Sequence, residues 1–269
     1  MTVNVLHGGL LSGWWSDGER LDERLAMIAA ELRALDPDVV GVQEASVGPR
    51  RGDVPARLAA ALGFAHVFAP VRWGGRAWFG SVLSTLAGFD EGPAVLSRFP
   101  IHAWEARAVR ACGELWPRML LCAELDTPWG GVDACSTHVA GDICQAESLR
   151  DLLAARRRAG PLIVTGDLNA REDSDALRLL IRDIGLVDTF RQANPDAPGL
   201  TVWQWVHAAA PTVRRRVDYV LVGGGAGLAA HVVASQVVLY VPRRAADGST
   251  LWPSDHYGVL SEIELVPRP

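Results

Sequence analysis

Short apolar runs alternate with helical segments along this sequence, and that alternation most limits the folds open to the chain. Strand-like runs cover residues 2–6, 39–42, 64–70, 94–96, 162–164, 217–222, 231–240 and 257–265. Helical spacing is found at 21–35, 55–62, 144–158 and from about 174 to Gly185. Residues 128–131 join two further alternating runs, 119–125 and 132–136, as a hairpin. Hairpins mixed with strand–helix–strand units favour an α/β sandwich with mixed sheets over a purely parallel sheet.

The length and composition are those of one large domain, which we expect to span residues 1–269. The chain has 269 residues, 49% of them hydrophobic, and no linker, repeat or low-complexity tract divides it. Residues 71–92 are rich in Gly and Trp and are predicted to form a long loop. The net charge of -5 argues against a nucleic-acid binder, although a local basic groove stays compatible with it. All 26 basic residues are Arg, which excludes Schiff-base catalysis by Lys and a P-loop Lys.

The cysteines and the hydropathy profile indicate in which cellular compartment the protein is expected. The four cysteines show no Cys-x-x-Cys spacing, so buried reduced thiols are expected, and these suit a reducing environment. No signal peptide precedes the first strand, and no apolar stretch is long enough to span a bilayer. These features predict a cytoplasmic protein, and we expect it to be a monomer. The cysteines are Cys112, Cys122, Cys135 and Cys144.

Polar residues recur where the predicted strands end. Rigid strands can aim such side chains into a shared crevice, where catalytic residues are commonly found. Each residue also has a structural alternative: Asn4 could cap a turn, Glu44 could cap the segment after its strand, and His138 could be a satisfied core histidine. The set comprises Asn4, Glu44, His138, Asp167, Asn169, Asp255 and His256, with Asp218 inside an apolar strand.

Taken together, these residues suit hydrolysis of a phosphate ester. Mg²⁺ prefers oxygen ligands and keeps several waters, so Glu44 could hold it with Asp255 as a supplement. Asp167 is the best candidate for the base that activates or orients water. Asp218 beside an imidazole would fix its tautomer and keep it a cation. Donors that could neutralise the charge developing on phosphate are His138, Asn169 and His256.

The order of short motifs resembles that of the endonuclease/exonuclease/phosphatase superfamily, which includes abasic-site endonucleases, neutral sphingomyelinases, inositol polyphosphate phosphatases and deadenylases. The resemblance extends from residue 3 to residue 258 and rests on all the segments in order, because each alone is short. The matching segments are Val3-Asn4-Val5, Val42-Gln43-Glu44, Ala94 to Ile101, Ser136-Thr137-His138, Gly166-Asp167-Leu168-Asn169-Ala170, Arg216-Val217-Asp218-Tyr219 and Ser254-Asp255-His256.

The resemblance implies a four-layered α/β/β/α sandwich with two packed sheets and a divalent cofactor, Mg²⁺ or Mn²⁺. It implies metal binding by Glu44, with Asn4 and Asp255 nearby, and water activation by Asp167 beside Asn169. It also implies that His256 pairs with Asp218 and contacts the scissile phosphate, and that His138 holds a phosphate oxygen. One position departs from the pattern: where several relatives have an acidic residue two positions after the first Asn, this chain has Leu6, followed by His7. Either one metal contact is missing, or His7 replaces it.

The substrate is less constrained than the chemistry. Tryptophans in presumed loops either pack those loops onto the sandwich or form an aromatic rim for a base, a ring or a lipid surface. Trp252 and Arg118 are the predicted substrate contacts. We expect a small phosphorylated molecule or a nucleotide end, with an intracellular DNA nuclease as the alternative. A binding module without activity is the alternative of another class. The loop residues are Trp14, Trp15, Trp73, Trp78, Trp203, Trp205 and Trp252, with Arg72 and Arg76.

Overall fold

A computed structural model describes residues 1–7, 20–49, 51–71, 89–114, 117–157, 160–245 and 247–267. Most of the predicted loop at 71–92 therefore lies outside the described residues. The same holds for Trp14, Trp15, Trp73 and Trp78, and for Arg72 and Arg76.

The first sheet is built mainly from the two ends of the chain. Its strand order is β12-β15-β1-β2-β5-β4, and the short strand β3 pairs with β2. Strand β1 is parallel to β2 and antiparallel to β15. The strands are β1 (Thr2–Asn4), β2 (Val39–Gly48), β3 (Gly52–Asp53), β4 (Ala65–Phe68), β5 (Asp90–Ser97), β12 (Leu228–Val238) and β15 (Gly258–Pro267).

The second sheet comes from the middle of the chain, in the order β10-β11-β9-β8-β7-β6. Its only parallel pair in the described chain is β8 with β9, and the predicted hairpin is β7 with β8. The strands are β6 (Ile101–Val109), β7 (Arg118–Thr127), β8 (Gly130–His138), β9 (Leu162–Asp167), β10 (Val187–Asp188) and β11 (Asp218–Gly223). A separate small hairpin pairs β13 (Arg243–Arg244) with β14 (Thr250–Leu251).

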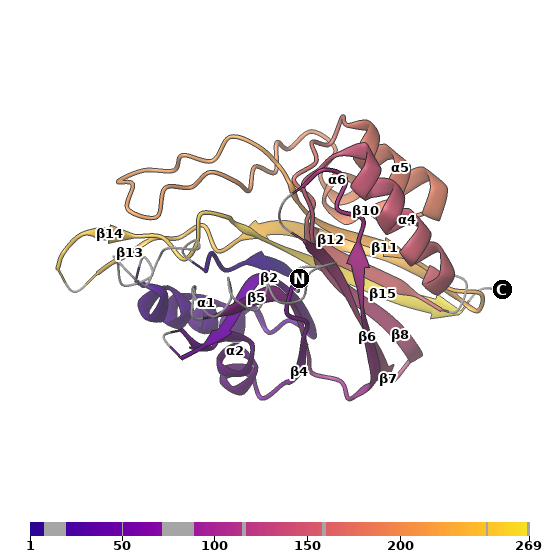
Figure 1. The fold of residues 1–269 in the computed structure, drawn as a ribbon, viewed down its shortest axis with the longest axis horizontal. Helices are drawn as coiled ribbons and strands as arrows, with labels where there is room; N and C mark the ends of the chain where they lie inside the picture. Colours follow the sequence, from indigo (N-terminus) through magenta and orange to yellow (C-terminus); the bar gives the residue numbers. More distant parts are fainter. Residues whose placement is uncertain are drawn as a thin grey trace.

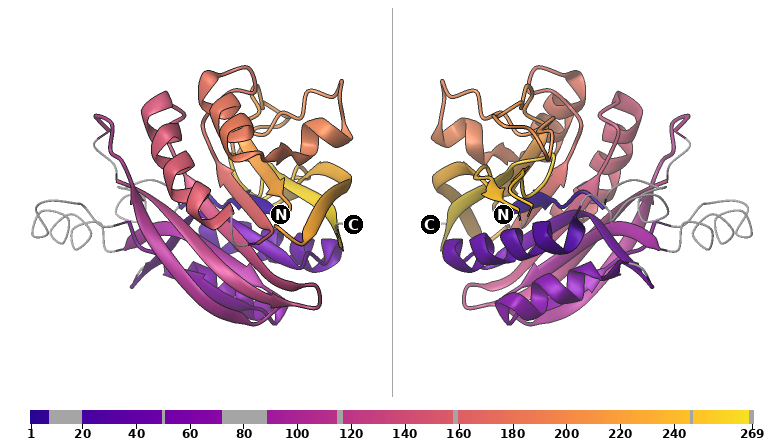
Figure 2. Two further views of the ribbon diagram at one scale, coloured as in Figure 1. Left: turned by 90° about the vertical axis from the view of Figure 1, so that its right-hand side faces the viewer. Right: turned by 90° about the vertical axis from the view of Figure 1, so that its left-hand side faces the viewer.

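The helices cover the outer faces of the two sheets, as Figures 1 and 2 show. Helices α1 (Leu21–Leu35) and α2 (Val54–Leu62) pack on the first sheet, and α4 (Ile143–Arg157) and α5 (Asp175–Ile184) pack on the second. Helix α1 connects the parallel strands β1 and β2, and α4 connects β8 and β9, as parallel pairs require. The predicted limits of α5 are confirmed, because Ser174 accepts from Leu177 N–H and Gly185 ends the helix with a φ of 68°. A short helix, α6 (Thr189–Ala193), follows β10.

The architecture confirms the predicted four-layered α/β/β/α sandwich. Apolar side chains of β5, β7 and β8 form a cluster between the sheets, with Val95, Leu121 and Leu125 at most 1% exposed. Polar contacts also cross the interface: Gln43 Nε2 donates to Ser136 Oγ at 3.0 Å, and Ser136 Oγ donates to the Val42 carbonyl at 3.0 Å. The two sheets are therefore joined by specific hydrogen bonds next to the strand ends that carry the site residues.

The two sheets pack so closely at position 41 that only glycine fits there. A Cβ added to Gly41 would lie 1.8 Å from Thr165 Oγ1 and 2.7 Å from Thr165 Cβ. We expect Gly41→Ala to lower the free energy of unfolding by about 3 kcal/mol or more, because the sheets must separate to admit the methyl group. Chemical denaturation measures this, with Gly131→Ala as the matched control, since a Cβ there meets nothing within 4 Å. Equal stabilities of the two variants would contradict this packing.

One prediction about the chain is wrong, and one long strand was missed. The four cysteines form disulfides, Cys112–Cys144 and Cys122–Cys135, so reduced thiols no longer support a cytoplasmic location. Strand β6 was not predicted, because most of its side chains are at least partly exposed and no clear apolar face marks it. Among the described residues, no helix is long and apolar enough to cross a membrane.

Candidate active site

The predicted site residues gather at one end of the sandwich. Because β1 is parallel to β2, and β8 to β9, the carboxyl end of β1 brings Asn4 beside Glu44, which lies within β2, and the carboxyl ends of β8 and β9 bring His138 beside Asp167. Asp218, at the start of antiparallel β11, pairs in register with Asp167. Asp255 and His256 directly precede β15, which is antiparallel to β1. The structure thus brings together all eight residues predicted for catalysis and metal binding.

A β-bulge presents Glu44 to the site. The register between β2 and β5 shifts between Val42 and Ala45, and Glu44 has a positive φ of 52°. Asn4 Nδ2 donates to Glu44 Oε1 at 3.0 Å and lies 3.3 Å from Asp167 Oδ2. Asn4 therefore links the carboxylate of one sheet to that of the other.

The Asp167 carboxylate is the centre of the cluster and is only 1% exposed. Its Oδ1 accepts from the Asn169 backbone N–H at 3.0 Å. Its Oδ2 lies 3.5 Å from His138 Nε2 and 3.6 Å from His256 Nε2. Asn169 has a positive φ of 48°, which lets its side chain turn back to within 3.1 Å of His138 Nε2. One oxygen of Asp167 is thus anchored by backbone, while the other faces two imidazoles.

His256 and Asp218 form a buried pair. His256 Nδ1 lies 2.9 Å from Asp218 Oδ2, and the Asp218 carboxylate is fully buried. Burial alone would lower the pKa of His256, but the Asp218 and Asp167 carboxylates outweigh it and raise that pKa well above its usual value. The pair therefore favours the imidazolium form of His256, whose Nε2 lies 3.6 Å from Asp167 Oδ2.

Glu44 and Asp255, the two carboxylates near Asn4, have pKa values that are shifted in opposite directions. Burial would raise the pKa of Glu44, but His7, His138 and the Asn4 hydrogen bond outweigh it and lower the pKa to about 2. Burial raises the pKa of Asp255 to about 6; His256 opposes the shift and the charge of Glu44 adds to it. The two neighbouring carboxylates thus differ in how readily they ionise, with Glu44 the stronger acid.

His7 lies beside these carboxylates, and so does Glu91, which was not predicted to be a site residue. His7 Nε2 is 3.0 Å from Glu91 Oε2 and 3.7 Å from Glu44 Oε2. Burial would lower the pKa of His7, but the Glu91 carboxylate outweighs it and raises that pKa. Glu91 comes from β5, opposite Ser46 and next to the bulge. Only the register of β2 and β5 places it here, and the sequence carried no signal for that register.

Arg118 and Trp252, the two predicted substrate contacts, lie in different surroundings. Arg118 begins β7, beside the strand that ends at His138, and its buried Nε has no hydrogen-bond partner among the described residues. Trp252 is only 2% exposed, donates from Nε1 to the Ala208 carbonyl at 2.7 Å and stacks on Tyr257. That burial argues against the predicted contact of Trp252 with substrate: the residue packs its loop.

Two other tryptophans are exposed next to the site. Trp203 is 49% and Trp205 71% exposed. Their segment is held against the His256 strand by the Val202–His256 bridge and by Gln204 N–H, which donates to the Asp255 carbonyl at 2.9 Å. The Arg215 guanidinium stacks 3.8 Å from the Trp203 ring centre. Trp203 and Trp205, unlike Trp252, therefore present exposed rings in the segment bound to Asp255 and His256.

Two groups of described residues have ligand atoms close enough to share a metal ion. Asp167, Asp218 and His256 have such atoms within 4.8 Å of one another, which provides a cluster of oxygen and nitrogen donors at the site. In the other group, Cys112, Asp142 and Cys144, the thiols are consumed by the disulfide. A metal centre among these groups therefore belongs at the Asp167 end of the sandwich.

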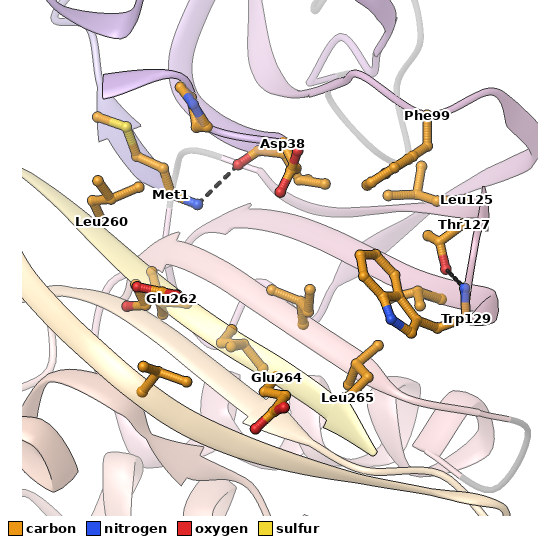
Figure 3. Close-up of a pocket in the computed structure, with 18 of the residues that line it drawn as sticks. Met1, Asp38, Phe99, Leu125, Thr127, Trp129, Leu260, Glu262, Glu264 and Leu265 are labelled. Atoms are coloured by element: carbon orange, nitrogen blue, oxygen red, sulfur yellow. Dashed lines mark hydrogen bonds between the residues drawn. The ribbon is translucent and has the colours of Figure 1, made fainter. Parts of the chain in front are cut away.

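A cavity of about 710 Å³ lies at the opposite end of the sandwich. Its walls come from the other ends of the same strands, including Val39, Leu125 and Ile163. Figure 3 shows Trp129 beside this cavity, with Glu262 and Glu264 on the β15 side. None of the predicted site residues lines it, so this cavity is separate from the candidate active site.

Known proteins share this architecture. The structure superimposes on an endonuclease/exonuclease/phosphatase family protein from Leptotrichia buccalis C-1013-b with a TM-score of 0.70, 18% identity and coverage of 98% of both chains. A mannosyl-6-phosphatase from Bacteroides thetaiotaomicron VPI-5482 gives 0.71, 18% and 98% of both chains. An endonuclease/exonuclease/phosphatase from Beutenbergia cavernae DSM 12333 gives 0.67 and 26%, covering 98% of this chain and 70% of the other. A comparison with curated proteins gives no significant match.

The sequence itself matches the family model described as the Endonuclease/Exonuclease/phosphatase family over residues 1–256. That match includes every strand end of the candidate site, from Asn4 to His256. Members of this family are hydrolases that act on phosphate esters. The chain belongs to the endonuclease/exonuclease/phosphatase family.

Proposed function

We propose that this chain, acting as a single domain, is a divalent-metal-dependent phosphohydrolase that uses an Asp167-activated water for in-line attack on a phosphate ester. The observation that carries the proposal is the convergence on Asp167 of Asn4, His138 and His256 from both sheets. Convergence of buried acids, amides and imidazoles is a pattern of hydrolytic sites rather than of a folding core.

Glu44, Asn4 and Asp255 would hold the metal. The fit rests on the donor set: the Glu44 carboxylate accepts from Asn4 at 3.0 Å, and burial, to which the charge of Glu44 adds, raises the pKa of Asp255, so a cation there would favour its charged form. Carboxylate and amide oxygens are ligands that Mg²⁺ prefers, and Mn²⁺ accepts the same set. When bound, such an ion polarises the phosphate and stabilises the charge that develops on it.

Asp167 would accept the proton of the attacking water. Its anchored Oδ1 keeps the carboxylate in place, and its Oδ2 faces the space bounded by His138 and His256. His256 as imidazolium would contact the scissile phosphate, while His138 and Asn169 would hold a phosphate oxygen. Arg118, whose buried Nε has no partner in the described chain, would add a further contact to phosphate.

The pH dependence of turnover would report on the Asp218–His256 pair. The raised pKa keeps His256 charged toward alkaline pH, so activity should fall as the pH rises through that pKa. Asp218→Asn removes the carboxylate 2.9 Å from Nδ1. We expect the alkaline limb of kcat/KM to move to lower pH by about one unit or more. Profiles that superimpose for wild type and variant would contradict the role of the pair.

For the substrate we propose a small phosphorylated molecule or a nucleotide end, taken up by a monomer. The exposed rings of Trp203 and Trp205 support a ring-bearing substrate, since aromatic side chains stack on bases and sugars. The net charge of -5 disfavours the binding of long nucleic acid. A DNA nuclease is therefore only the second candidate. A cytoplasmic location is no longer supported by the cysteines, which are paired.

Hydrolysis of a panel of phosphate esters tests the proposal. The panel contains a generic phosphodiester, a phosphomonoester, abasic DNA, single-stranded RNA and sphingomyelin, each with Mg²⁺, Mn²⁺ or EDTA. Turnover that EDTA abolishes is expected, and the preferred ester selects the substrate class. Absence of both turnover and metal binding would instead favour an inactive binding module.

A further inference from the structure

An imidazole stands beside the carboxylate proposed as the main metal ligand. His7 Nε2 is 3.7 Å from Glu44 Oε2, and His7 is 9% exposed. Two ligand atoms that share one ion at about 2.1 Å lie roughly 3.0 to 3.5 Å apart. A shift of a few tenths of an ångström would therefore let His7 and Glu44 bind the same ion.

The surroundings of His7 keep its ring at this place. The Leu6 backbone has a positive φ of 49°, and its N–H donates to Asn4 Oδ1 at 3.0 Å, which turns the chain directly after β1. The His7 ring packs 5.2 Å from the ring of Phe89, which is itself covered by the Arg51 guanidinium at 3.9 Å. The imidazole is thus held by packing. Its Nε2 also lies 3.0 Å from Glu91 Oε2, so this nitrogen must give up that contact, and its proton, when it binds an ion.

We propose that His7 is a metal ligand beside Glu44 and that it makes the site select a transition-metal ion such as Mn²⁺ over Mg²⁺. Imidazole nitrogen binds first-row transition ions well, whereas Mg²⁺ prefers oxygen alone. The inference rests on the proposed function only in placing an ion at Glu44. It adds which ion the site prefers, and it adds a nitrogen ligand to the oxygen ligands proposed above.

A competing account makes the opposite prediction. His7 could serve only as a cation between Glu44 and Glu91, in which case an incoming ion must displace its charge. Removing His7 would then strengthen the binding of every divalent ion. If His7 is a ligand, its removal weakens Mn²⁺ binding and leaves Mg²⁺ binding nearly unchanged. The two accounts therefore differ in the sign of the effect.

The test is calorimetric titration of the untagged full chain with Mn²⁺ and with Mg²⁺. For His7→Gln and His7→Ala we expect the Kd for Mn²⁺ to rise about 10- to 100-fold and that for Mg²⁺ less than about threefold. The matched control is His231→Ala, an exposed histidine on β12. A direct readout is the ¹⁴N coupling of bound Mn²⁺ in pulsed electron paramagnetic resonance, which should decrease in both His7 variants.

Each outcome has one meaning. An unchanged ratio of Mn²⁺ to Mg²⁺ affinity in the His7 variants, or tighter binding of both ions, would overturn the role of His7 and leave the metal-dependent function intact. Wild-type protein that binds neither ion would overturn both proposals. The ¹⁴N signal of wild-type protein needs no variant, so a variant that fails to fold does not block the test: wild-type Mn²⁺ without imidazole coupling would exclude His7 as a ligand.

Discussion

Asp167→Asn is expected to lower kcat by about a thousandfold, within the range that general-base catalysis contributes. The amide keeps the size of the carboxylate, and its oxygen can still accept from Asn169 N–H, the bond that anchors Oδ1 at 3.0 Å. What is lost is the negative charge between His138 and His256 and the ability to take a proton from water. The effect should therefore fall on the chemical step rather than on the fold.

Steady-state kinetics on the best ester of the panel measure this loss, and thermal unfolding shows whether the fold survives. Asp173→Asn is the matched control, because Asp173 is an exposed aspartate that pairs only with Arg171 in the described chain. A variant with wild-type kcat would remove Asp167 from the role of base. A variant that has lost its cooperative unfolding would be uninformative by itself, so Asp167→Ser serves as a second substitution.

Glu44→Gln is expected to raise the Kd for the divalent ion by about a hundredfold or more, beyond the 10- to 100-fold cost typical of outer-shell changes. Gln can still accept the hydrogen bond of Asn4, which spans 3.0 Å. The variant loses a carboxylate whose pKa, lowered to about 2, keeps it charged at neutral pH. At saturating metal, kcat should recover more than it does for Asp167→Asn.

Metal titration with Mn²⁺ and Mg²⁺ provides the measurement. Glu262→Gln is the control, since Glu262 is an exposed carboxylate of β15 at the far end of the sandwich. Unchanged affinity in Glu44→Gln would place the metal elsewhere, with the Asp167, Asp218 and His256 group as the next candidate.

Much of the fold was predictable because its signals are local. The apolar alternation of β7 and β8, the caps of α5 and the runs that became β1 and β9 depend on neighbours in the sequence. Strand β6 lacks such a signal, since it depends on β7 for its register. The placement of Glu91 opposite Ser46 depends in the same way on the bulge at Glu44.

The disulfide in the hairpin depends on the exact register of its strands. A turn at 128–131, as predicted, would place Cys122 opposite Thr137. The observed register pairs Thr127 with Gly130 and thereby places Cys122 opposite Cys135, with Cα atoms 4.0 Å apart. The Cys112–Cys144 pair could not be foreseen, because it joins the loop after β6 to the start of α4.

The site was predictable to the extent that its residues end strands. Asn4, Glu44, His138 and Asp167 follow from strand ends, and their meeting follows from parallel pairing of β1 with β2 and of β8 with β9. Arg216, the last of three consecutive arginines, is the opposite case. It is 5% exposed and donates to both oxygens of Asp188, at 2.6 and 3.1 Å. A long-range partner of that kind leaves no trace in the sequence.

The most direct test of the central claim is hydrolysis of the best panel ester in ¹⁸O-labelled water, with EDTA and then with Mn²⁺ or Mg²⁺ restored. An Asp167-activated water attacking phosphorus predicts one ¹⁸O in the phosphoryl product, no reaction in EDTA and recovery when metal is added. Label in the released alcohol, or hydrolysis that continues undiminished in EDTA, would contradict metal-dependent attack of water on phosphorus.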